Sequence, residues 1–512
     1  MNNLPFEPMR RVAFAALSLV ALSATAGDWR DKVDPALRAE LAKGAGAPVR
    51  VLIVPSVTDK ARIDIAALSA RTPPRQRPQV VHAALLAQAK ATQAGVLAWL
   101  RREGIAYQAF SVANAVAATL PANRLDTLAK RADVARIDAD PVIHHALPKA
   151  EPLQFGKAVT AIELGINYIN APAVWALPGN PRGTGIVVAG QDTGYRWTHA
   201  ALKAKYRGWN GVSANHDYQW HDAVHSGGGV CGANAVAPCD DHGHGTHTMG
   251  TMIGDDGGTN QIGVAPDAKW IACRNMDVGN GTPTTYLECF EFFLAPYPVG
   301  GTPAQGDPNL APHVINNSWG CPTSEGCNSG NWATMQTAIS NLTAAGVLVV
   351  VSAGNDGSGC STVNAPPAFF DESFSVGNLS ASTGIIASSS SRGPVTVDGS
   401  NRMKPDIAAP GSSVRSAVNS GDTSYTTMSG TSMAGPHVAG AAALFMSAVP
   451  ALQRQPVLVR QYLEQSATAV SSTACSSVGV PNNLYGHGRL DVLAAVQAAL
   501  VVYPYLFADG FE

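Results

Sequence analysis

Three side chains that lie far apart in the sequence could together turn a hydroxyl into a nucleophile. Asp192 follows an apolar run, His244 lies in the stretch DHGHGTHTMG, and Ser432 precedes a long uncharged run. A serine hydroxyl is a weak nucleophile until a neighbouring base takes its proton, and imidazole can take it near neutral pH. A carboxylate that orients the imidazole completes a Ser-His-Asp arrangement, whose chemistry is acyl transfer.

The stretch Thr427–Val449 must hold Ser432 in place. After Ser429 it contains no Asp, Glu, Lys or Arg, and its length resembles that of a membrane span. Its early Ser, Thr and Gly residues, with Pro436 and His437, favour instead the central buried helix of a globular domain. We place Pro436 in the first helical turn, where no intrahelical N–H is lost, and Ser432 at the helix start. The alternative is that Ser432 only caps the helix.

Short apolar runs lead into the other polar positions. Gly185–Gly190 leads to Asp192, Val314–Gly320 forms a second run, and Val347–Val351 leads to Asn355. Strands buried on both faces of a parallel sheet show such runs, and α/β sheets place their sites at the carboxyl ends of the strands. The pattern therefore predicts an α/β domain in which a mainly parallel sheet packs against the buried helix.

Four motifs resemble those of the subtilisin-like serine proteases, or subtilases. They are QDTG at 191–194, HGTH at 244–247, SAGN at 352–355 and GTSMAGPHVAG at 430–440. The match extends from about Gly165 to Val496, and the insertion at 214–240 with the run GTNQIGVAPDAKWIA resembles the bacillopeptidase F branch. The resemblance implies a three-layer, subtilisin-like catalytic domain over residues 161–500.

The resemblance also implies roles for individual residues of a serine endopeptidase. Asp192, His244 and Ser432 would form the catalytic triad, with Asn355 as the side-chain donor of the oxyanion hole. The substrate-binding residues implied in the same way are Ser318, Trp319, Gly320, Ala353 and Gly354. Asp356 would lie at the rim of the first specificity pocket and Asn364 near its base, which would favour a basic residue before the cleaved bond. No cofactor is required, although calcium is a common stabiliser in the family.

Clustered histidines raise the alternative of a zinc hydrolase. His242 and His247 flank His244, and His221 and His225 lie upstream. A Glu between two His, as in the H-E-x-x-H zinc motif, is missing. The resemblance assigns His247 a structural role and His242 a place at the rim of the site. A further alternative is a binding protein that keeps the fold without catalysis.

Acidic residues could hold a structural calcium ion. The candidates are Asp240, Asp241, Asp255 and Asp256, but no DxDxDG-like loop is present. We expect these four carboxylates to lie in solvent rather than to bind calcium, and we predict no metal in the catalytic site.

The N-terminus has the features of a secretory signal peptide. Arg10 and Arg11 precede the apolar run Val12–Leu22, and Ala24-Thr25-Ala26 predicts cleavage after Ala26. We therefore expect a secreted or extracellular protein, with the periplasm or the cell surface as alternative destinations. A net charge of −2 at pH 7 gives no electrostatic attraction to nucleic acid or to anionic membranes, and we expect a monomer.

The eight cysteines agree with export, because exported chains commonly form disulfides. Sequence alone allows many pairings. Short closed loops favour Cys231–Cys239 and Cys321–Cys327. Cys273–Cys289 is the next shortest loop, which leaves Cys360–Cys475 as the long closure.

Residues 27–160 predict a small domain and a linker ahead of the catalytic domain. Strand-like runs are Val49–Pro55, Gln108–Leu120 and Val134–Ile143, and helical spacing occurs at Gln79–Glu103 and Ala122–Arg131. The order β-α-β-α-β indicates an α+β, ferredoxin-like sandwich. It resembles the propeptide of subtilases, which is a chaperone and intramolecular inhibitor of the enzyme. A standalone binding module is the alternative.

The irregular stretch LPKAEPLQFGKAV predicts an exposed linker. We expect the processing cut between Leu147 and Glu163, and the substrates of the mature enzyme to be proteins or peptides. Residues 501–512 form a short tail, which is either a sorting signal or a frayed terminus.

Overall fold

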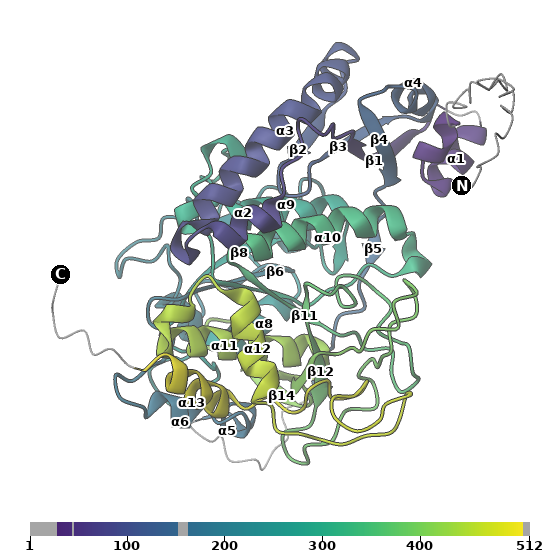
Figure 1. Cartoon of the computed structure of the whole chain (residues 1–512). Coiled ribbons are helices and arrows are strands. Elements are labelled where there is room, and N and C mark those ends of the chain that lie inside the picture. The colour runs from purple at the N-terminus through teal and green to yellow at the C-terminus, as the bar shows by residue number, and fades with distance from the viewer. Residues whose placement is uncertain (1–27, 44–45, 152–161, 505–512) are drawn as a thin grey trace, which may run out of the picture.

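The computed structural model describes residues 28–43, 46–151 and 162–504. Figure 1 shows a small N-terminal domain lying on a larger α/β domain. The predicted signal peptide, part of the predicted linker and most of the predicted tail lie outside the described residues.

The N-terminal domain is an antiparallel sheet packed against helices. Its strands β1 (Pro48–Pro55), β2 (Tyr107–Phe110), β3 (Ala115–Pro121) and β4 (Val134–Ala139) have the order β2-β3-β1-β4. Helix α3 (Arg77–Arg102) connects β1 to β2, α4 (Leu125–Ala129) connects β3 to β4, and α1 (Pro35–Ala42) and α2 (Ile65–Arg71) are additional. The βαββαβ order is that of the predicted ferredoxin-like class, although the sequence pattern predicted the order β-α-β-α-β with one strand fewer.

Two strand predictions in this domain were too long. The run Gln108–Leu120 is divided into two strands by a turn at Asn114, whose φ is 47°. The run Val134–Ile143 stops pairing with β1 at Ala139. Val112 and Ala113 continue the apolar pattern through the first interruption and so conceal it, whereas Asp140 and Pro141 mark the second.

Within the described residues, the larger domain is built on a seven-stranded parallel sheet in the order β13-β12-β11-β10-β6-β8-β7. The strands are β6 (Val187–Asp192), β7 (Trp220–Asp222), β8 (Lys269–Arg274), β10 (Val314–Asn317), β11 (Leu348–Ser352), β12 (Phe374–Leu379) and β13 (Ile407–Pro410). In β11, Val350 belongs to one apolar core, and Val349 and Val351 belong to the other. Because both of its faces are covered, β11 is apolar up to its last residue, Ser352.

Helices on both faces give the domain three layers. One face carries α8 (His244–Ile253), α11 (Thr431–Ala448), α12 (Pro456–Gln465) and α13 (Val492–Val502), and the other carries α9 (Pro283–Leu294) and α10 (Ser329–Ala344). Shorter elements are α5 (Leu164–Tyr168), α6 (Ala171–Trp175), α7 (Ala200–Lys203), the hairpin β14 (Val414–Ala417) and β15 (Tyr425–Met428), and the pair β5 (Ile143–His144) and β9 (Asn280–Gly281). The predicted α/β fold is confirmed.

Helix α11 is the buried central helix, and it contacts β10, β11, β12 and β13. A Cβ at Gly435 would lie 2.9 Å from Asn316 Oδ1, so a glycine lets the helix approach β10 closely. Pro436 lies inside the helix, so its predicted place in the first turn was wrong. Since proline has no N–H, the carbonyl of Ser432 loses its helical partner. The hydroxyl of Ser318 donates to that carbonyl instead, at 3.2 Å.

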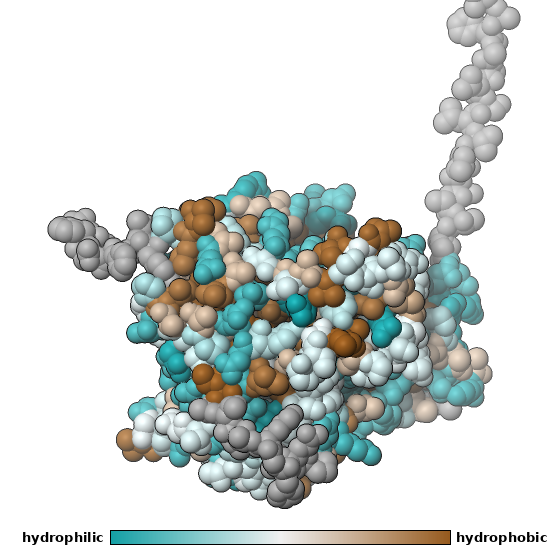
Figure 2. Space-filling model, turned by 90° about the horizontal axis from the view of Figure 1, so that it is seen from below, coloured by the Kyte–Doolittle hydropathy of each residue, from teal (hydrophilic) through white to brown (hydrophobic). Residues whose placement is uncertain are grey.

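All four predicted disulfides are present: Cys231–Cys239, Cys273–Cys289, Cys321–Cys327 and Cys360–Cys475. In the part of the chain that the structure describes, no helix is both long and apolar enough to span a bilayer. The face of the molecule that lies away from the N-terminal domain carries small, separate apolar patches among polar residues (Figure 2).

The N-terminal domain packs against α9 and α10 of the larger domain (Figure 1). Asn341 Nδ2 on α10 donates to the carbonyl of Val112 at 2.8 Å, and the hydroxyl of Ser69 donates to the carbonyl of Ala344 at 2.6 Å. Glu291 on α9 accepts hydrogen bonds from the hydroxyl of Ser111 and from the N–H of Val112. Polar groups of the two domains are thus paired across a buried contact.

Candidate active site

Asp192 and His244 form a buried, hydrogen-bonded pair. Asp192 ends β6 at the carboxyl edge of the sheet, and His244 begins α8. His244 Nδ1 lies 2.7 Å from Asp192 Oδ1, and neither residue is more than 1% exposed. A Cβ at Gly245 would lie 2.1 Å from the carbonyl oxygen of Gly194 and 3.0 Å from the Cβ of Asp192. Only glycine therefore lets α8 approach the end of β6 closely enough for this pair to form.

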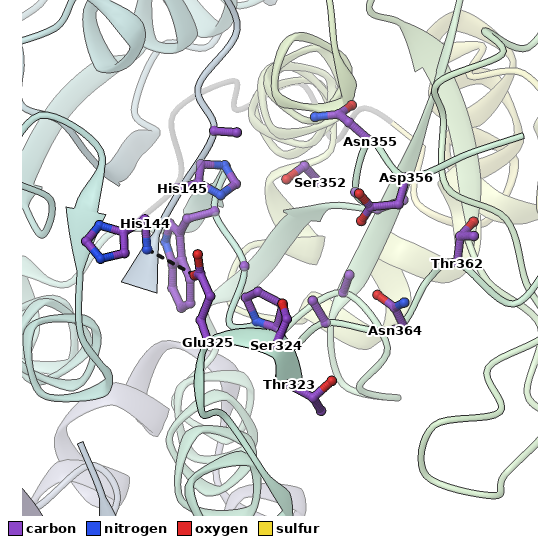
Figure 3. A pocket seen from close by; sticks show the side chains of 18 residues that line it. His144, His145, Thr323, Ser324, Glu325, Ser352, Asn355, Asp356, Thr362 and Asn364 are labelled. Carbon is purple, nitrogen blue, oxygen red and sulfur yellow. Dashed lines mark hydrogen bonds between the residues drawn. The ribbon is translucent and has the colours of Figure 1, made fainter. Parts of the chain in front are cut away.

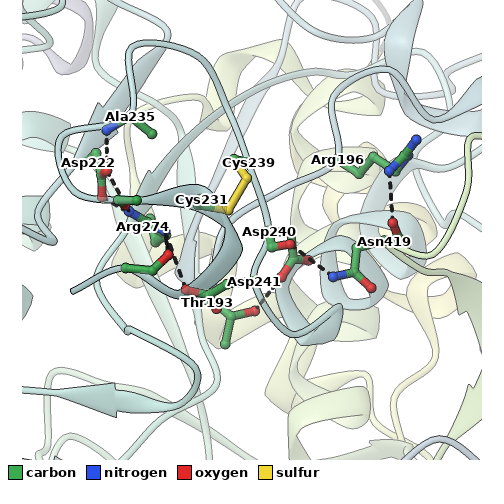
Figure 4. The surroundings of a disulfide bond; sticks show 12 residues. Thr193, Arg196, Asp222, Cys231, Ala235, Cys239, Asp240, Asp241, Arg274 and Asn419 are labelled. Atoms are coloured by element: carbon green, nitrogen blue, oxygen red, sulfur yellow. Dashed lines mark hydrogen bonds and ion pairs between the residues drawn. A yellow bond between two sulfur atoms is a disulfide. The ribbon is translucent and has the colours of Figure 1, made fainter.

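Asp240 supports the start of α8 (Figure 4). Its Oδ1 accepts from the hydroxyl of Thr193 at 2.9 Å and from the N–H of Gly243 at 2.7 Å, and its Oδ2 accepts from the N–H of Thr246 at 2.9 Å. A carboxylate at this position also faces the positive end of the helix dipole. The prediction that Asp240 lies in solvent was wrong, because the residue is buried and its oxygens are occupied.

The other three predicted calcium candidates also have partners. Asp241 lies 3.3 Å from Arg274, and burial raises the pKa of Asp241 to about 7. Asp255 lies 3.3 Å from Arg182, and Asp256 Oδ2 accepts from Asn260 at 2.6 Å. Within the described residues no group of three or more His, Cys, Asp or Glu side chains is arranged for a metal ion. All four carboxylates are thus engaged by protein groups.

Ser432 is the second residue of α11 and is 1% exposed. Helices α8 and α11 pack against each other, which brings the helix starts that carry His244 and Ser432 to the same side of the sheet. Among the described residues, neither Ser432 Oγ nor His244 Nε2 has a hydrogen-bond partner, although both atoms are buried. Both atoms are thus buried polar groups whose hydrogen-bonding capacity is unused by the described residues.

Asn355 lies after β11 with its side-chain oxygen held. Asn355 Oδ1 accepts from the N–H of Thr431 at 2.9 Å and from the Thr431 hydroxyl at 3.0 Å. The amide nitrogen would lie 3.5 Å from a Cβ at Gly430, so it lies beside the turn that precedes Ser432. With its oxygen engaged, the exposed Asn355 presents an N–H donor at the start of α11.

A hollow of about 530 Å³ opens beside this helix start (Figure 3). Of the predicted substrate-binding residues, Trp319, Gly320, Ala353 and Gly354 line it, as do Asn355, Asp356 and Asn364. Ser318 is not in its wall, and its hydroxyl instead supports α11 through the Ser432 carbonyl. The structure adds Glu325 and Thr323, which come from the loop between Cys321 and Cys327 and which the motif comparison missed.

The chain that leaves the N-terminal domain runs through this hollow. Strand β5 pairs antiparallel with β9, the N–H of His145 donates to the carbonyl of Gly279 at 2.9 Å, and His144, His145 and Ala146 line the pocket. Beyond the helix start, the N–H of Glu151 donates to the carbonyl of Thr427 at 2.7 Å. The segment 143–151 therefore crosses the site from one side to the other.

The ring of His145 is close to the Asp192–His244 pair. Burial, helped by the neighbouring His244 and opposed by Asp192, lowers the pKa of His145 to about 4. The ring is thus neutral above this pH. No sequence motif marks His145, because its position depends on where the segment crosses the larger domain.

The histidines of the zinc alternative point to separate partners. His244 bonds Asp192, and the buried His247 Nε2 lies 3.0 Å from the carbonyl of Val414. Burial lowers the pKa of His247 to about 3, in keeping with the structural role expected for it. Upstream, His221 and His225 both bond Glu288, at 2.7 and 2.9 Å.

The sequence profile of the subtilase family matches residues 183–488. The chain belongs to the subtilase family of serine endopeptidases. Bacillopeptidase F of Bacillus subtilis (strain 168) is 39% identical over 354 residues, which are 67% of this chain and 22% of that protein. This identity confirms the predicted likeness to the bacillopeptidase F branch.

This subtilase is also similar to shorter relatives. Subtilisin E of Bacillus subtilis (strain 168) is 28% identical over 390 residues, or 76% of this chain and 82% of that protein. Alkaline protease of Alkalihalobacillus alcalophilus is 29% identical over 366 residues, or 71% and 77%. The chain thus spans 22% of the length of Bacillopeptidase F and most of the length of the other two.

Proposed function

We propose that this subtilase is an exported serine endopeptidase, made as a zymogen, that hydrolyses peptide bonds of proteins through an acyl-enzyme. The proposal depends on one observation, the 2.7 Å contact between Asp192 and His244 next to the helix start that carries Ser432. Asn355 adds a free amide donor at the same helix start.

In the proposed mechanism, His244 Nε2 accepts the proton of Ser432 as Oγ attacks the carbonyl carbon of the substrate. Asp192 orients the ring and stabilises the imidazolium without taking the proton. Asn355 Nδ2 and the backbone N–H of Ser432 receive the charge on the tetrahedral oxygen, helped by the positive end of α11. His244 then protonates the leaving amine, and water hydrolyses the acyl-enzyme by the same steps in reverse order.

The zymogen would cut its own chain between Ala146 and Leu147. Ala146 is the last residue of the segment that lines the pocket. Beyond it, Pro148 Cγ lies 3.4 Å from where a Cβ at Gly430 would be, next to the turn before Ser432. The bond that follows Ala146 is therefore the one nearest the nucleophile. This is one residue before the window that the linker sequence suggested.

The test is the N-terminus of the secreted enzyme. Mass spectrometry should find a mature chain beginning at Leu147, and Ser432→Ala should keep the N-terminal domain attached. A fluorophosphonate probe should label the wild type at Ser432, which separates an active enzyme from an inactive binding protein. Normal processing of Ser432→Ala in a host without other proteases would contradict the proposal.

Specificity would be set at the hollow beside α11. Asp356 and Asn364 line it, which favours a basic or polar side chain before the cleaved bond. A peptide-library profile with only bulky apolar residues at that position would contradict this. No cofactor takes part in the mechanism.

Before release, the N-terminal domain would act as an intramolecular inhibitor, because its last segment fills the site. Export is supported by the signal-like residues 1–26 and by four disulfides, which persist in oxidising compartments. We propose that the mature enzyme is a monomer, which size-exclusion chromatography would test.

A further inference from the structure

The loop between Cys321 and Cys327 brings a carboxylate to the substrate cleft. A disulfide closes this loop, and the short helix η7 (Thr323–Glu325) turns within it, with the N–H of Glu325 donating to the carbonyl of Pro322 at 3.2 Å. Gly326 has a φ of +97°, and a Cβ there would lie 3.1 Å from Pro141. The loop is therefore short, internally bonded and packed against the segment that enters the cleft.

Glu325 binds the backbone of that segment. Its Oε2 accepts the N–H of His144 at 3.0 Å, as Figure 3 shows. Counted back from the Ala146–Leu147 bond, His144 is the third residue before the cut. The N–H of the next residue, His145, goes to a main-chain oxygen of Gly279. Among the described residues, Glu325 is thus the carboxylate that accepts a backbone N–H from one of the three residues before the cleaved bond.

A carboxylate can accept an internal amide N–H, as Glu291 does from Val112, but it is a stronger partner for a charged amino group. If a substrate began at this third position, its α-ammonium nitrogen would occupy the place of the His144 nitrogen. A hydrogen bond between two charged groups is roughly twice as strong as one between neutral groups. Glu325 would then discriminate between a chain that begins at this position and a chain that continues past it.

We propose that Glu325 binds the free α-amino group of substrates that begin three residues before the cleaved bond, so that the mature enzyme also releases tripeptides from free N-termini. The inference depends on the triad and the cleavage register of the proposed function. Hydrolysis is unchanged: water adds across the third peptide bond and yields a tripeptide acid and a new amino terminus.

Longer substrates would still be cut. A fourth residue before the bond adds a contact like that of Ile143, which pairs with Gly281 of β9. Acetylation of the amino group therefore has two opposite effects on hydrolysis. It removes the charge that would bind Glu325, and it adds a group that can contact β9. The inference is therefore tested by whether the effect of acetylation changes when Glu325 is replaced.

The probes are the hexapeptide AAALPK with a free N-terminus and the same peptide with an N-acetyl group. We would measure kcat/KM for both with the processed wild type, with Glu325→Gln and with Asp356→Asn. Asp356 is the matched control, because it also lines the pocket but makes no bond to the segment among the described residues. The free-to-acetyl ratio should fall about tenfold in Glu325→Gln and stay within about twofold in Asp356→Asn.

A second readout is pH. The α-amino group titrates at about 7.7–8.0, so the wild-type ratio should fall between pH 7 and pH 9.5 and the Glu325→Gln ratio should not. The titratable groups near Glu325 in the processed enzyme are Tyr286 and, in the wall of the same pocket, Asp356, which act on both peptides alike. Equal free-to-acetyl ratios of kcat/KM in the wild type and in Glu325→Gln would overturn this inference and leave the proposed function intact. A wild type that hydrolyses neither peptide nor any protein would overturn the proposed function as well.

Discussion

Replacing Glu291 by Ala should weaken the binding of the N-terminal domain to the larger domain much more than replacing Glu291 by Gln. Glu291 is 4% exposed on α9. Its Oε1 accepts the hydroxyl of Ser111 at 2.5 Å, and its Oε2 accepts the N–H of Val112 at 2.7 Å. This side chain contacts the turn between β2 and β3, away from the cleft, so that its effect on retention is separable from catalysis.

The magnitude follows from what each substitution leaves behind. Ala would leave the N–H of Val112 buried without an acceptor, which costs about 1–3 kcal/mol, and would remove the Ser111 bond, worth about 1 kcal/mol. The sum of about 2–4 kcal/mol corresponds to roughly 30- to 1,000-fold weaker retention. Gln keeps an acceptor for Val112, and the Ser111 hydroxyl can turn to accept from the amide. The Gln substitution removes the carboxylate charge and also the cost of burying that charge. We therefore expect the free energy of binding the N-terminal domain to change by no more than about 1 kcal/mol.

The assay is the recovery of peptidase activity after the processed, non-covalent complex is diluted. The Glu291→Ala complex should dissociate at a concentration about 30- to 1,000-fold higher than the wild-type complex, whereas Glu291→Gln should resemble the wild type. Equal dissociation of all three complexes would refute the reasoning. Burial raises the pKa of Glu291, so protonation is favoured in the complex. Acidification towards pH 4.5 should therefore not release the domain through this residue.

Three further changes test the support of the site. Gly245→Ala should lower kcat/KM by about 100-fold or more, because a Cβ 2.1 Å from the Gly194 carbonyl must displace α8 from Asp192; unchanged kinetics would contradict this. Asp240→Asn should lower the free energy of unfolding by about 1–3 kcal/mol in thermal or denaturant melts, since its amide would face N–H donors at the start of α8. The hydrogen bond to Glu288 raises the pKa of His225 to about 9, so its stabilisation is complete below pH 6.5 and is lost as pH rises through 9. Because the His225 ring is half-exposed, solvent screening reduces this contribution to about 1 kcal/mol. The free energy of unfolding should fall by that amount between pH 6.5 and 9 in the wild type but not in Glu288→Gln, and parallel pH profiles of unfolding for the two proteins would refute the assignment.

The chemistry of the site could be predicted from the sequence because each motif carries its own local geometry. Asp192 follows a run that can only be a buried strand, and His244 follows Gly243, whose φ of +103° suits a glycine at a helix start. The same locality explains the disulfides, since three of the four close loops of 6 to 16 residues. Such features depend on neighbours along the chain.

Errors in prediction occurred where a partner is distant in the sequence. Asp240 was expected in solvent, but the turn after β6, which carries Thr193 47 residues away, packs against it and encloses it with the start of α8. Pro436 was expected in the first turn of α11, but the Ser318 hydroxyl, 114 residues away, occupies the carbonyl that this proline leaves free. In an isolated helix, no group would replace the N–H that Pro436 lacks.

The sequence by itself determined the α/β order of the domain, because short apolar runs and their spacing specify buried strands, and its motifs led through the subtilase resemblance to the roles proposed for Asp192, His244, Ser432 and Asn355. The tertiary structure alone decided that the segment 143–151 crosses the site, that Glu291 contacts the N-terminal domain and that Glu325 faces a substrate backbone. These three contacts join groups 136 to 181 residues apart. No local pattern encodes a pairing of that kind, since it exists only after the two domains have folded and packed together.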